Sequence, residues 1–398
     1  MIDILPPAFS RPALFLAPHL EYPAFNGADV TIVDLARALS KRLPWVDVVA
    51  AHETVTYNGG KETARRAFSN AMRSKPAAAM RTIGWRSHYY LEKFVTPAFA
   101  REARAHLARP GYGLVYHSYL TTSILADLPD ADRTHVVWSH NDEFQWFEDL
   151  RESTRNPIGK AAASASLAWL SRYLGTHRDA LTLLHVTQAD LDGWERHVPG
   201  HRGAVVPIGV ALRGDAAPPL ASNQPVRLVF SGALGVRMNY DALAHFADRY
   251  ALALQDRLGH FTLTVVGSTP LDETRALCRT QGWTLRENVS DDEMDRHFRE
   301  ATFSLLPFPY ATGAKLKLLK SLAYGVPVLT TSSVGAQADL VVPPSLMSDD
   351  PTAWADHAAA IQASGLSAED RGQLRALAEA HSWDASAERL LSVAAAHA

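Results

Sequence analysis

The sequence predicts an α/β protein made of two units, each with a mostly parallel β-sheet. Short apolar runs alternate with amphipathic helical patterns in both halves of the chain, and this order is typical of parallel sheets. The alternation stops at a Pro- and Ala-rich segment, Gly214–Pro225, and then starts again. A length of 398 residues also fits two or three domains of about 100–200 residues each.

The first unit opens with a strand, a loop, a helix and a second strand. Ala13–Ala17 is a short apolar run between two prolines, as in a buried strand, and the loop Pro18–Gly27 follows it. Apolar residues recur at helical spacing over Asp29–Leu43, and Trp45–Ala51 predicts the next strand. Later elements of this unit are expected as strands at Gly113–Tyr116, Thr134–Ser139 and Leu181–Thr187 and as a helix at Ala161–Ala180, and the segment Val205–Val210 closes the unit.

The second unit repeats the alternation. Its strands are expected at Arg227–Ser231, Thr262–Val266, Thr284–Arg286, Thr302–Pro307 and Pro327–Thr331, and its helices at Asn239–Leu254, Asp291–Ala301 and Lys315–Tyr324. We therefore expect domains at residues 1–213 and 227–375, a linker at 214–226 and a C-terminal helix at 376–398. Two such units joined by one linker predict a cleft between them, faced by the carboxyl ends of both sheets.

The composition excludes several classes of protein. With 47% hydrophobic and 20% charged residues, the chain is not disordered, collagenous or a coiled coil. A net charge of −3 gives the whole molecule no strong attraction to nucleic acid. The single cysteine, Cys278, excludes a disulfide framework and a zinc site built from several cysteines. Because no spanning segment or signal peptide is recognisable, we expect a cytoplasmic protein.

Residues 61–110 stand out by their charge. They contain eleven Lys and Arg residues and three Glu residues, so this stretch carries +8 within a chain of net charge −3. Aromatic residues such as Trp85 and Phe94 are interleaved with the charges. A solvated surface explains this composition, and a peripheral contact with an anionic membrane, on the inner face of the cell membrane, is the alternative. Nucleic-acid binding is not expected, because no recognition module accompanies the charge.

Two glycine-containing loops lie between a strand and a helix, where backbone N–H groups and the helix dipole favour anions. In the second loop an arginine stands beside a helix start that an asparagine is expected to cap, which predicts a diphosphate cradle. An ordinary βα turn with a solvated arginine would have the same residues, and both possibilities stay open. The residues concerned are Asn26 and Gly27 in the first loop and Gly232, Gly235, Arg237 and Asn239 in the second.

The most specific segment of the chain follows the strand that ends at Pro307. A loop bends at Gly313, and a helix is expected to begin near Ala314 and to carry Lys315 and Lys317. A helix start with two lysines predicts a second anion site. A surface helix with solvated lysines is the alternative.

Together these segments resemble the GT-B glycosyltransferases and, more narrowly, the retaining family 4. The family's Gly-x-Arg/Lys-x-Lys run, which ends in Gly-x-Pro-Val, is similar to Gly313–Val328. The resemblance covers nearly the whole chain and implies two Rossmann-like domains facing across a cleft, with a C-terminal helix crossing back to the first domain. The other landmarks, in family order, are the Gly27 loop, Val136–His140, Val205–Val210, Val265–Gly267 and His381–Asp384.

Three departures from the family pattern concern the nucleotide. The family's two glutamates, of which the second accepts hydrogen bonds from the donor ribose, are replaced by Thr312 and Lys320. Arg237 has no following lysine partner, and the Gly-Gly of the first loop is Gly27-Ala28. Phosphate binding is therefore expected, whereas the identity of the nucleotide is left open.

The resemblance implies a metal-independent, hexosyltransferase-type enzyme of polysaccharide or cell-envelope assembly. It is expected to move a sugar, with retention, from a nucleotide-sugar donor to a glycan, lipid-linked or other glycoconjugate acceptor. The first domain would take the acceptor and the second the donor nucleotide, and neither a cofactor nor a metal is expected. A catalytically silent GT-B subunit and a sugar-nucleotide epimerase of the same fold are the alternatives.

The transfer chemistry assigns roles to individual residues. The leaving diphosphate needs cations, so Arg237 and Lys317 are expected to be catalytic. By resemblance, His140 is the cleft histidine that holds a sugar hydroxyl. A structural, hydrogen-bonded histidine is the alternative for His117. The expected donor-binding residues are Gly27, Gly232, Gly235, Asn239, Gly313, Ala314 and Lys315, and the expected substrate-binding residues are Asn26, His117, Asn141 and Glu143.

Overall fold

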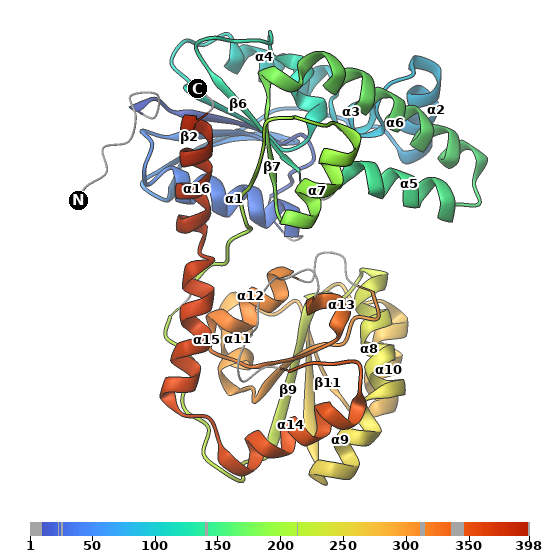
Figure 1. Cartoon of the computed structure of the whole chain (residues 1–398), viewed down its shortest axis with the longest axis vertical. Coiled ribbons are helices and arrows are strands. Elements are labelled where there is room, and N and C mark those ends of the chain that lie inside the picture. The colour runs from blue at the N-terminus through green and yellow to red at the C-terminus, as the bar shows by residue number, and fades with distance from the viewer. Residues whose placement is uncertain are drawn as a thin grey trace. The chain divides into compact units, whose positions relative to one another are not determined.

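The chain folds into two α/β units, as the alternating pattern predicts (Figure 1). The computed structural model describes residues 10–22, 24, 27–139, 142–212, 214–310, 315–335 and 346–396. Unit 1 comprises Met1–Ile208 and Trp383–Ala398, and unit 2 comprises Gly209–Ser382.

In the described part of unit 1, eight strands form one sheet in the order β4-β3-β2-β1-β5-β6-β7-β8. The β3 and β4 strands pair antiparallel, whereas β1, β2 and β5 to β8 run parallel to one another. The strands are β1 (Ala13–Leu16), β2 (Val46–Val49), β3 (Glu53–Asn58), β4 (Lys61–Ala67), β5 (Leu114–His117), β6 (Thr134–Ser139), β7 (Thr182–His185) and β8 (Gly203–Val205).

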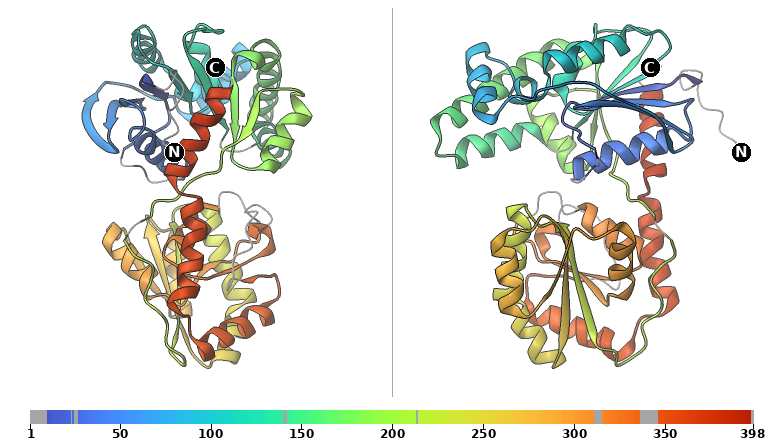
Figure 2. Two further views of the ribbon diagram at one scale, coloured as in Figure 1. Left: turned by 60° about the vertical axis from the view of Figure 1, so that its left-hand side comes forward. Right: turned by 180° about the vertical axis from the view of Figure 1, so that it is seen from behind.

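Helices cover both faces of this sheet, and two of them come from opposite ends of the chain. The C-terminal helix α16 packs against α1, so the predicted return of the chain to the first domain is confirmed (Figures 1 and 2). The helices of unit 1 are α1 (Gly27–Leu39), α2 (Lys75–Trp85), α3 (Tyr89–Phe94), α4 (Pro97–Leu107), α5 (Glu143–Ser153), α6 (Pro157–His177), α7 (Gln188–His197) and α16 (Trp383–Ala396), with 3-10 helices η2 (Leu120–Leu125) and η3 (Arg178–Ala180).

The strands show why the sheet has a buried centre and a charged edge. All four residues of β1 are buried, because neighbouring strands flank it and helices cover its two faces. At the edge, every residue of β4 is exposed, and its lysine and arginines discourage pairing with another chain. Sequence periodicity did not predict the β3–β4 hairpin, since β4 has no apolar face.

Unit 2 contains a second, all-parallel sheet in the order β11-β10-β9-β12-β13-β14 among the described residues. Helices α8 and α10 lie on one side of this sheet and α11 and α12 on the other (Figures 1 and 2). The strands are β9 (Val226–Ala233), β10 (Phe261–Ser268), β11 (Thr284–Glu287), β12 (Phe303–Leu306), β13 (Val328–Thr330) and β14 (Leu346–Met347). The helices are α8 (Arg237–Arg249), α9 (Ala251–Leu258), α10 (Asp272–Gln281), α11 (Asp291–Glu300), α12 (Lys315–Ala323), α13 (Ser332–Gly335), α14 (Pro351–Ser364) and α15 (Ala368–Ala380).

Glycines allow a close approach of the backbone at the carboxyl ends of β9 and β10. Gly232 is paired with Gly267, and a Cβ atom added to Gly267 would lie 1.8 Å from the carbonyl oxygen of Gly232. A Cβ atom on Gly235 would lie 2.7 Å from the carbonyl oxygen of Thr269. The end of β10 at Gly267 and the loop after β9 at Gly235 therefore have no room for a side chain.

The segment expected to be a linker packs within unit 2. Ala217 is buried, and its N–H donates to the carbonyl oxygen of Tyr324 at 2.7 Å. Leu220 forms a β-bridge with Leu366. This Pro- and Ala-rich stretch therefore belongs to unit 2, and the boundary between the two units lies after Ile208.

A helix that crosses a bilayer needs about 20 mostly apolar residues. Among the described helices, none combines the length and the apolar character needed to cross a membrane.

Candidate functional site

In unit 2, the loop after β9 leads into a helix whose amino end has no side-chain cap. The residue at the N-cap of α8 is Val236, and its side chain forms no capping hydrogen bond. The prediction that Asn239 caps this helix is wrong, because Asn239 lies within its first turn. Its Nδ2 donates to the carbonyl oxygen of Ala233 at 2.7 Å. Asn239 therefore holds the glycine loop from inside the helix.

Asn239 also joins this loop to α12. Its Oδ1 accepts a hydrogen bond from Nζ of Lys317 at 2.8 Å. The Lys317 Nζ atom lies 5.1 Å from the centre of the Phe308 ring, which follows β12. The structure thus brings together two residues that the sequence predicted separately, Asn239 and Lys317.

Lys317 carries its positive charge in surroundings that are depleted of water. No carboxylate lies within ion-pair distance of its ammonium group in the part of the chain that the structure describes. The surrounding protein displaces water from the ammonium group and lowers the pKa of Lys317 to about 8. A bound anion would restore the electrostatic stabilisation that water no longer supplies.

Arg237 has different surroundings. It is exposed, and its guanidinium group lies 2.9 Å from Asp241 and 3.7 Å from Glu273. Asp241 also accepts a hydrogen bond of 2.6 Å from the hydroxyl of Tyr310. Two carboxylates therefore balance the charge of Arg237, whereas the hydrogen-bond partner of Lys317 in the described part of the chain is a neutral amide.

The remaining predicted residues of unit 2 are described in part. Gly313 and Ala314 lie outside the described residues, as does Thr312. Lys315 is the first residue of α12, although its side chain is not described. Lys320, in place of the family's ribose-binding glutamate, lies with its Nζ 5.2 Å from the centre of the Phe298 ring.

In unit 1, the strands β5 and β6 end in the polar residues His117 and Ser139. His140, Asn141 and Asn26 lie outside the described residues. Gly27 is the first residue of α1, and its carbonyl oxygen accepts a hydrogen bond from Oγ1 of Thr31 at 2.7 Å.

His117 is buried at the end of β5, and both of its ring nitrogens have partners. Nδ1 lies 2.9 Å from Oγ1 of Thr122, and Nε2 lies 3.1 Å from Nδ1 of His135. Burial, with the nearby His135 ring, holds the pKa of His117 well below its usual range. This geometry favours the structural role that the sequence analysis left open for His117.

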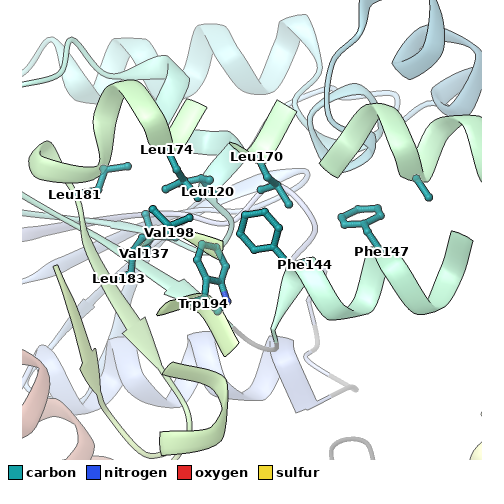
Figure 3. Close-up of a cluster of buried hydrophobic side chains, with 11 residues drawn as sticks. Leu120, Val137, Phe144, Phe147, Leu170, Leu174, Leu181, Leu183, Trp194 and Val198 are labelled. Atoms are coloured by element: carbon teal, nitrogen blue, oxygen red, sulfur yellow. The ribbon is translucent and has the colours of Figure 1, made fainter. Parts of the chain in front are cut away.

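Glu143 is placed by the hydrophobic core beneath it. It is the first residue of α5, after the N-cap Asp142, and the next residue, Phe144, packs with Leu170 and Trp194 in the cluster drawn in Figure 3. The same cluster takes Phe147 one turn further along α5. Because these aromatic side chains anchor the helix, Glu143 is held at its buried amino end.

Glu143 and His88 form a buried pair in which both groups are neutral near pH 7. Oε2 of Glu143 lies 3.7 Å from Nε2 of His88, and neither atom has a hydrogen-bond partner among the described residues. Burial raises the pKa of Glu143 to about 8 and lowers the pKa of His88 to about 3. Nδ1 of His88 accepts a 3.1 Å hydrogen bond from the N–H of Tyr90, so the proton of the neutral ring is on Nε2.

Sequence reasoning missed several residues that shape these surroundings. Asp241 neutralises Arg237, Tyr310 orients Asp241, Phe308 lies under Lys317, and His88 faces Glu143. The position of Phe308 and Tyr310 directly after a buried strand was a usable signal, because side chains at a strand's carboxyl end line the ligand edge of a parallel sheet. No sequence signal marked His88, which is 55 positions from Glu143.

Residues 225–363 match the family model of the glycosyl transferases group 1. This match agrees with the two mostly parallel sheets and with the C-terminal helix that returns to unit 1. The chain has the GT-B glycosyltransferase fold. The resemblance drawn from the sequence is thus confirmed for the fold and, over residues 225–363, for the likeness to group 1, whereas the resemblance to the retaining family 4 stays a prediction.

Solved GT-B structures match nearly the full chain. WaaG, a glycosyltransferase involved in lipopolysaccharide biosynthesis, is 14% identical with a TM-score of 0.57, and the match covers 96% of this chain and 99% of WaaG. HepE from Anabaena, solved with UDP and glucose, is 12% identical with a TM-score of 0.56, covering 97% and 100%.

A protein with a different activity in its name matches equally well. The N-terminal domain of trehalose-6-phosphate phosphatase from Candida albicans is 11% identical, with a TM-score of 0.60 and coverage of 98% and 97%. Identities this low show the fold alone, and no curated protein matches the sequence.

We predict that Glu143→Gln stabilises the protein at high pH. Because folding raises the pKa of Glu143 from 4.5 to about 8, the carboxyl group opposes folding progressively as pH rises through this interval. The neutral amide should raise the melting temperature by on the order of 5 °C at pH 9 and change it little at pH 4.5. Glu152→Gln, on the exposed end of the same helix, is the control. An equal effect of Glu143→Gln at both pH values would contradict the assignment of a neutral buried carboxyl.

Proposed function

We propose that this protein is a glycosyltransferase that uses a nucleotide-sugar donor and transfers the sugar, with retention and without a metal, to a glycan or lipid-linked acceptor. The observation that carries the proposal is Lys317, a water-depleted ammonium group that has no acidic partner among the residues that the structure describes. Its partner Asn239 lies in the first turn of α8, and the positive end of a helix dipole favours a negative ligand.

A diphosphate matches this arrangement in charge and in chemistry. Sugar transfer leaves negative charge on the departing diphosphate, and a preorganised cation stabilises that charge most strongly where water is depleted. The group 1 match of residues 225–363 supports a nucleotide sugar as donor, as does the complex of HepE with UDP and glucose. We assign Lys317 to the leaving diphosphate and Arg237 to a secondary role, since two carboxylates already balance its charge.

The rest of the assignment concerns the sugar and the nucleoside. His140, which directly follows the last residue of β6, is proposed to hold a sugar hydroxyl on the acceptor side. At the position of α12 where the family has its ribose-binding glutamate, this chain has Lys320, which lies against Phe298. This position therefore offers no carboxylate to the ribose. We therefore leave the nucleobase open and propose that donor recognition depends on the diphosphate.

A catalytically silent GT-B subunit is the second candidate, and the same departures favour it. A chain whose ribose-binding acid is replaced by Lys320 could bind a nucleotide sugar without transferring the sugar. Release of free nucleoside diphosphate from any nucleotide sugar by the purified chain, above the rate in a His140→Ala variant, decides for the enzyme.

We predict that Lys317→Ala weakens UDP binding at pH 7 by about tenfold or more, measured by calorimetry, because a hydrogen bond to a charged group contributes about 1.5–3 kcal/mol. Uridine binding should change little. In the unsubstituted protein, affinity for UDP should fall as pH rises through about 8, where the ammonium loses its proton, and Lys317→Ala should lack this dependence.

Two control variants sharpen the result. Lys320→Ala removes a lysine from the same helix, and Arg237→Ala removes the balanced cation; each should change UDP affinity less than threefold. Inorganic pyrophosphate serves as a probe without a base. If Lys317→Ala and Lys320→Ala bind UDP equally well, the diphosphate assignment is wrong.

Within residues 61–110, we place the proposed membrane contact on α2, at its exposed residues Met80 and Trp85. Each of the three glutamates in this region already pairs with arginine: Glu62 with Arg65, Glu92 with Arg73 and Arg81, and Glu102 with Arg66. In contrast, α2 has no acidic residue, and its side chains Met80 and Trp85 are 57% and 71% exposed. Ile158, at the start of the neighbouring α6, is also exposed. An apolar face flanked by lysine and arginine suits anionic lipid headgroups.

We predict that the protein sediments with vesicles of phosphatidylcholine and phosphatidylglycerol and not with phosphatidylcholine alone. The double variant Met80→Ser, Trp85→Ser should lose at least about tenfold of this binding. Leu252→Ser is the control, because Leu252 is also 71% exposed but lies on α9 in unit 2. Equal indifference to both vesicle types at low salt would instead favour a solvated surface or a soluble acidic acceptor.

A further inference from the structure

Unit 1 contains a pocket at the end of its sheet opposite to Glu143 and His117. The pocket has a volume of about 460 Å³, within the range of small-molecule sites. It lies where β1, β2 and β5 begin, since Pro12, Trp45 and Tyr112 stand just before these strands and line it. Ligands of parallel sheets usually bind at the carboxyl ends of strands, so this pocket is separate from the candidate site of unit 1.

One buried carboxylate holds the walls of the pocket together. Asp47, which is only 6% exposed, accepts hydrogen bonds from Oγ1 of Thr56 at 2.6 Å and from the hydroxyl of Tyr112 at 2.5 Å. It also accepts from Nε1 of Trp45 at 3.3 Å. These three donors come from separate segments of the chain, so the shape of the pocket is fixed before a ligand arrives.

Trp45 presents a fixed aromatic surface at this pocket. Trp45 is 40% exposed, although leaving a large aromatic ring in water is unfavourable. Its indole N–H donates to Asp47, and this hydrogen bond fixes the orientation of the ring. A flat apolar ring beside polar groups suits a ligand with one apolar face and a rim of hydroxyl groups. A pyranose ring has this character.

The polar groups of the pocket set the expected charge of the ligand. Asn58 and Thr63 are exposed donors and acceptors from β3 and β4. Arg109 is exposed and forms no ion pair within the part of the chain that the structure describes, whereas Asp47 is already satisfied by its three donors. The accessible charge is therefore positive, and an arginine of this kind favours a carboxylate or phosphate in a two-point contact.

We infer that this pocket binds an acidic pyranose sugar, stacked on Trp45 with its acidic group at Arg109. The inference does not depend on the proposed transfer reaction, because none of the residues assigned to the donor or to the reaction lines the pocket. Such a site would hold an acidic glycan at a distance from the reacting sugar and so raise its effective concentration.

The test is ligand-observed NMR with methyl β-glucuronide as the probe and methyl β-glucoside as its uncharged counterpart. Glucose 6-phosphate distinguishes a phosphate from a carboxylate as the acidic group. The unsubstituted protein should bind at least one acidic sugar at least fivefold more tightly than the glucoside. Trp45→Ala and Arg109→Ala should each weaken that binding at least tenfold, whereas Trp45→Phe, which keeps a ring, should retain most of it.

Trp85→Ala is the matched control, because it removes an exposed tryptophan of the same unit that lies far from the pocket in sequence and on α2. UDP affinity and the melting temperature, measured in parallel, show that each variant is folded and keep this test separate from the donor assignment. The inference is overturned if neither acidic sugar binds at millimolar concentration, if the glucoside binds equally well, or if Trp85→Ala has the same effect as Trp45→Ala.

Discussion

The hydrogen bond between Lys317 and Asn239 is the interaction on which the donor-side geometry depends. It joins the helix α12 to the loop after β9, and the loop can take this course because Gly232 and Gly267 let two strand ends approach closely. A neutral amide orients the ammonium group without satisfying its charge. The protein therefore maintains a partly desolvated cation at a cost that a bound anion can offset.

The candidate sites of the two units contain different kinds of buried ionisable group. At the candidate site of unit 1, Glu143 and His88 are neutral partners, and His117 shares its nitrogens with His135 and Thr122, so burial at these three positions disfavours charge. In unit 2, Lys317 retains its charge near neutral pH and has no counterion within the described ranges. This difference agrees with a division of labour in which unit 2 takes the charged part of the donor.

The sequence was most informative where burial and periodicity coincide. The β1 strand and Thr134–Ser139 were predictable because a short, unbroken apolar run between polar loops is typical of a strand buried in a parallel sheet. Charged β4 was not predictable, because an exposed edge strand has no apolar face. Among the site residues, Lys317 and Asn239 were predictable from strand–loop–helix order, but their direct contact was not, since 78 positions separate them. The pairing of Arg237 with Asp241 and Glu273 was equally hidden, because a sequence does not show which exposed charges meet.

The most direct test of this account is an NMR titration of the Lys317 ammonium group in lysine-labelled protein, with the signal assigned by its loss in Lys317→Arg. The account predicts a pKa near 8 in the free protein and a clear rise of that pKa when UDP is added, because the diphosphate stabilises the protonated amine. A pKa close to the ordinary 10.5 in the free protein, or a low pKa that UDP leaves unchanged, would contradict it.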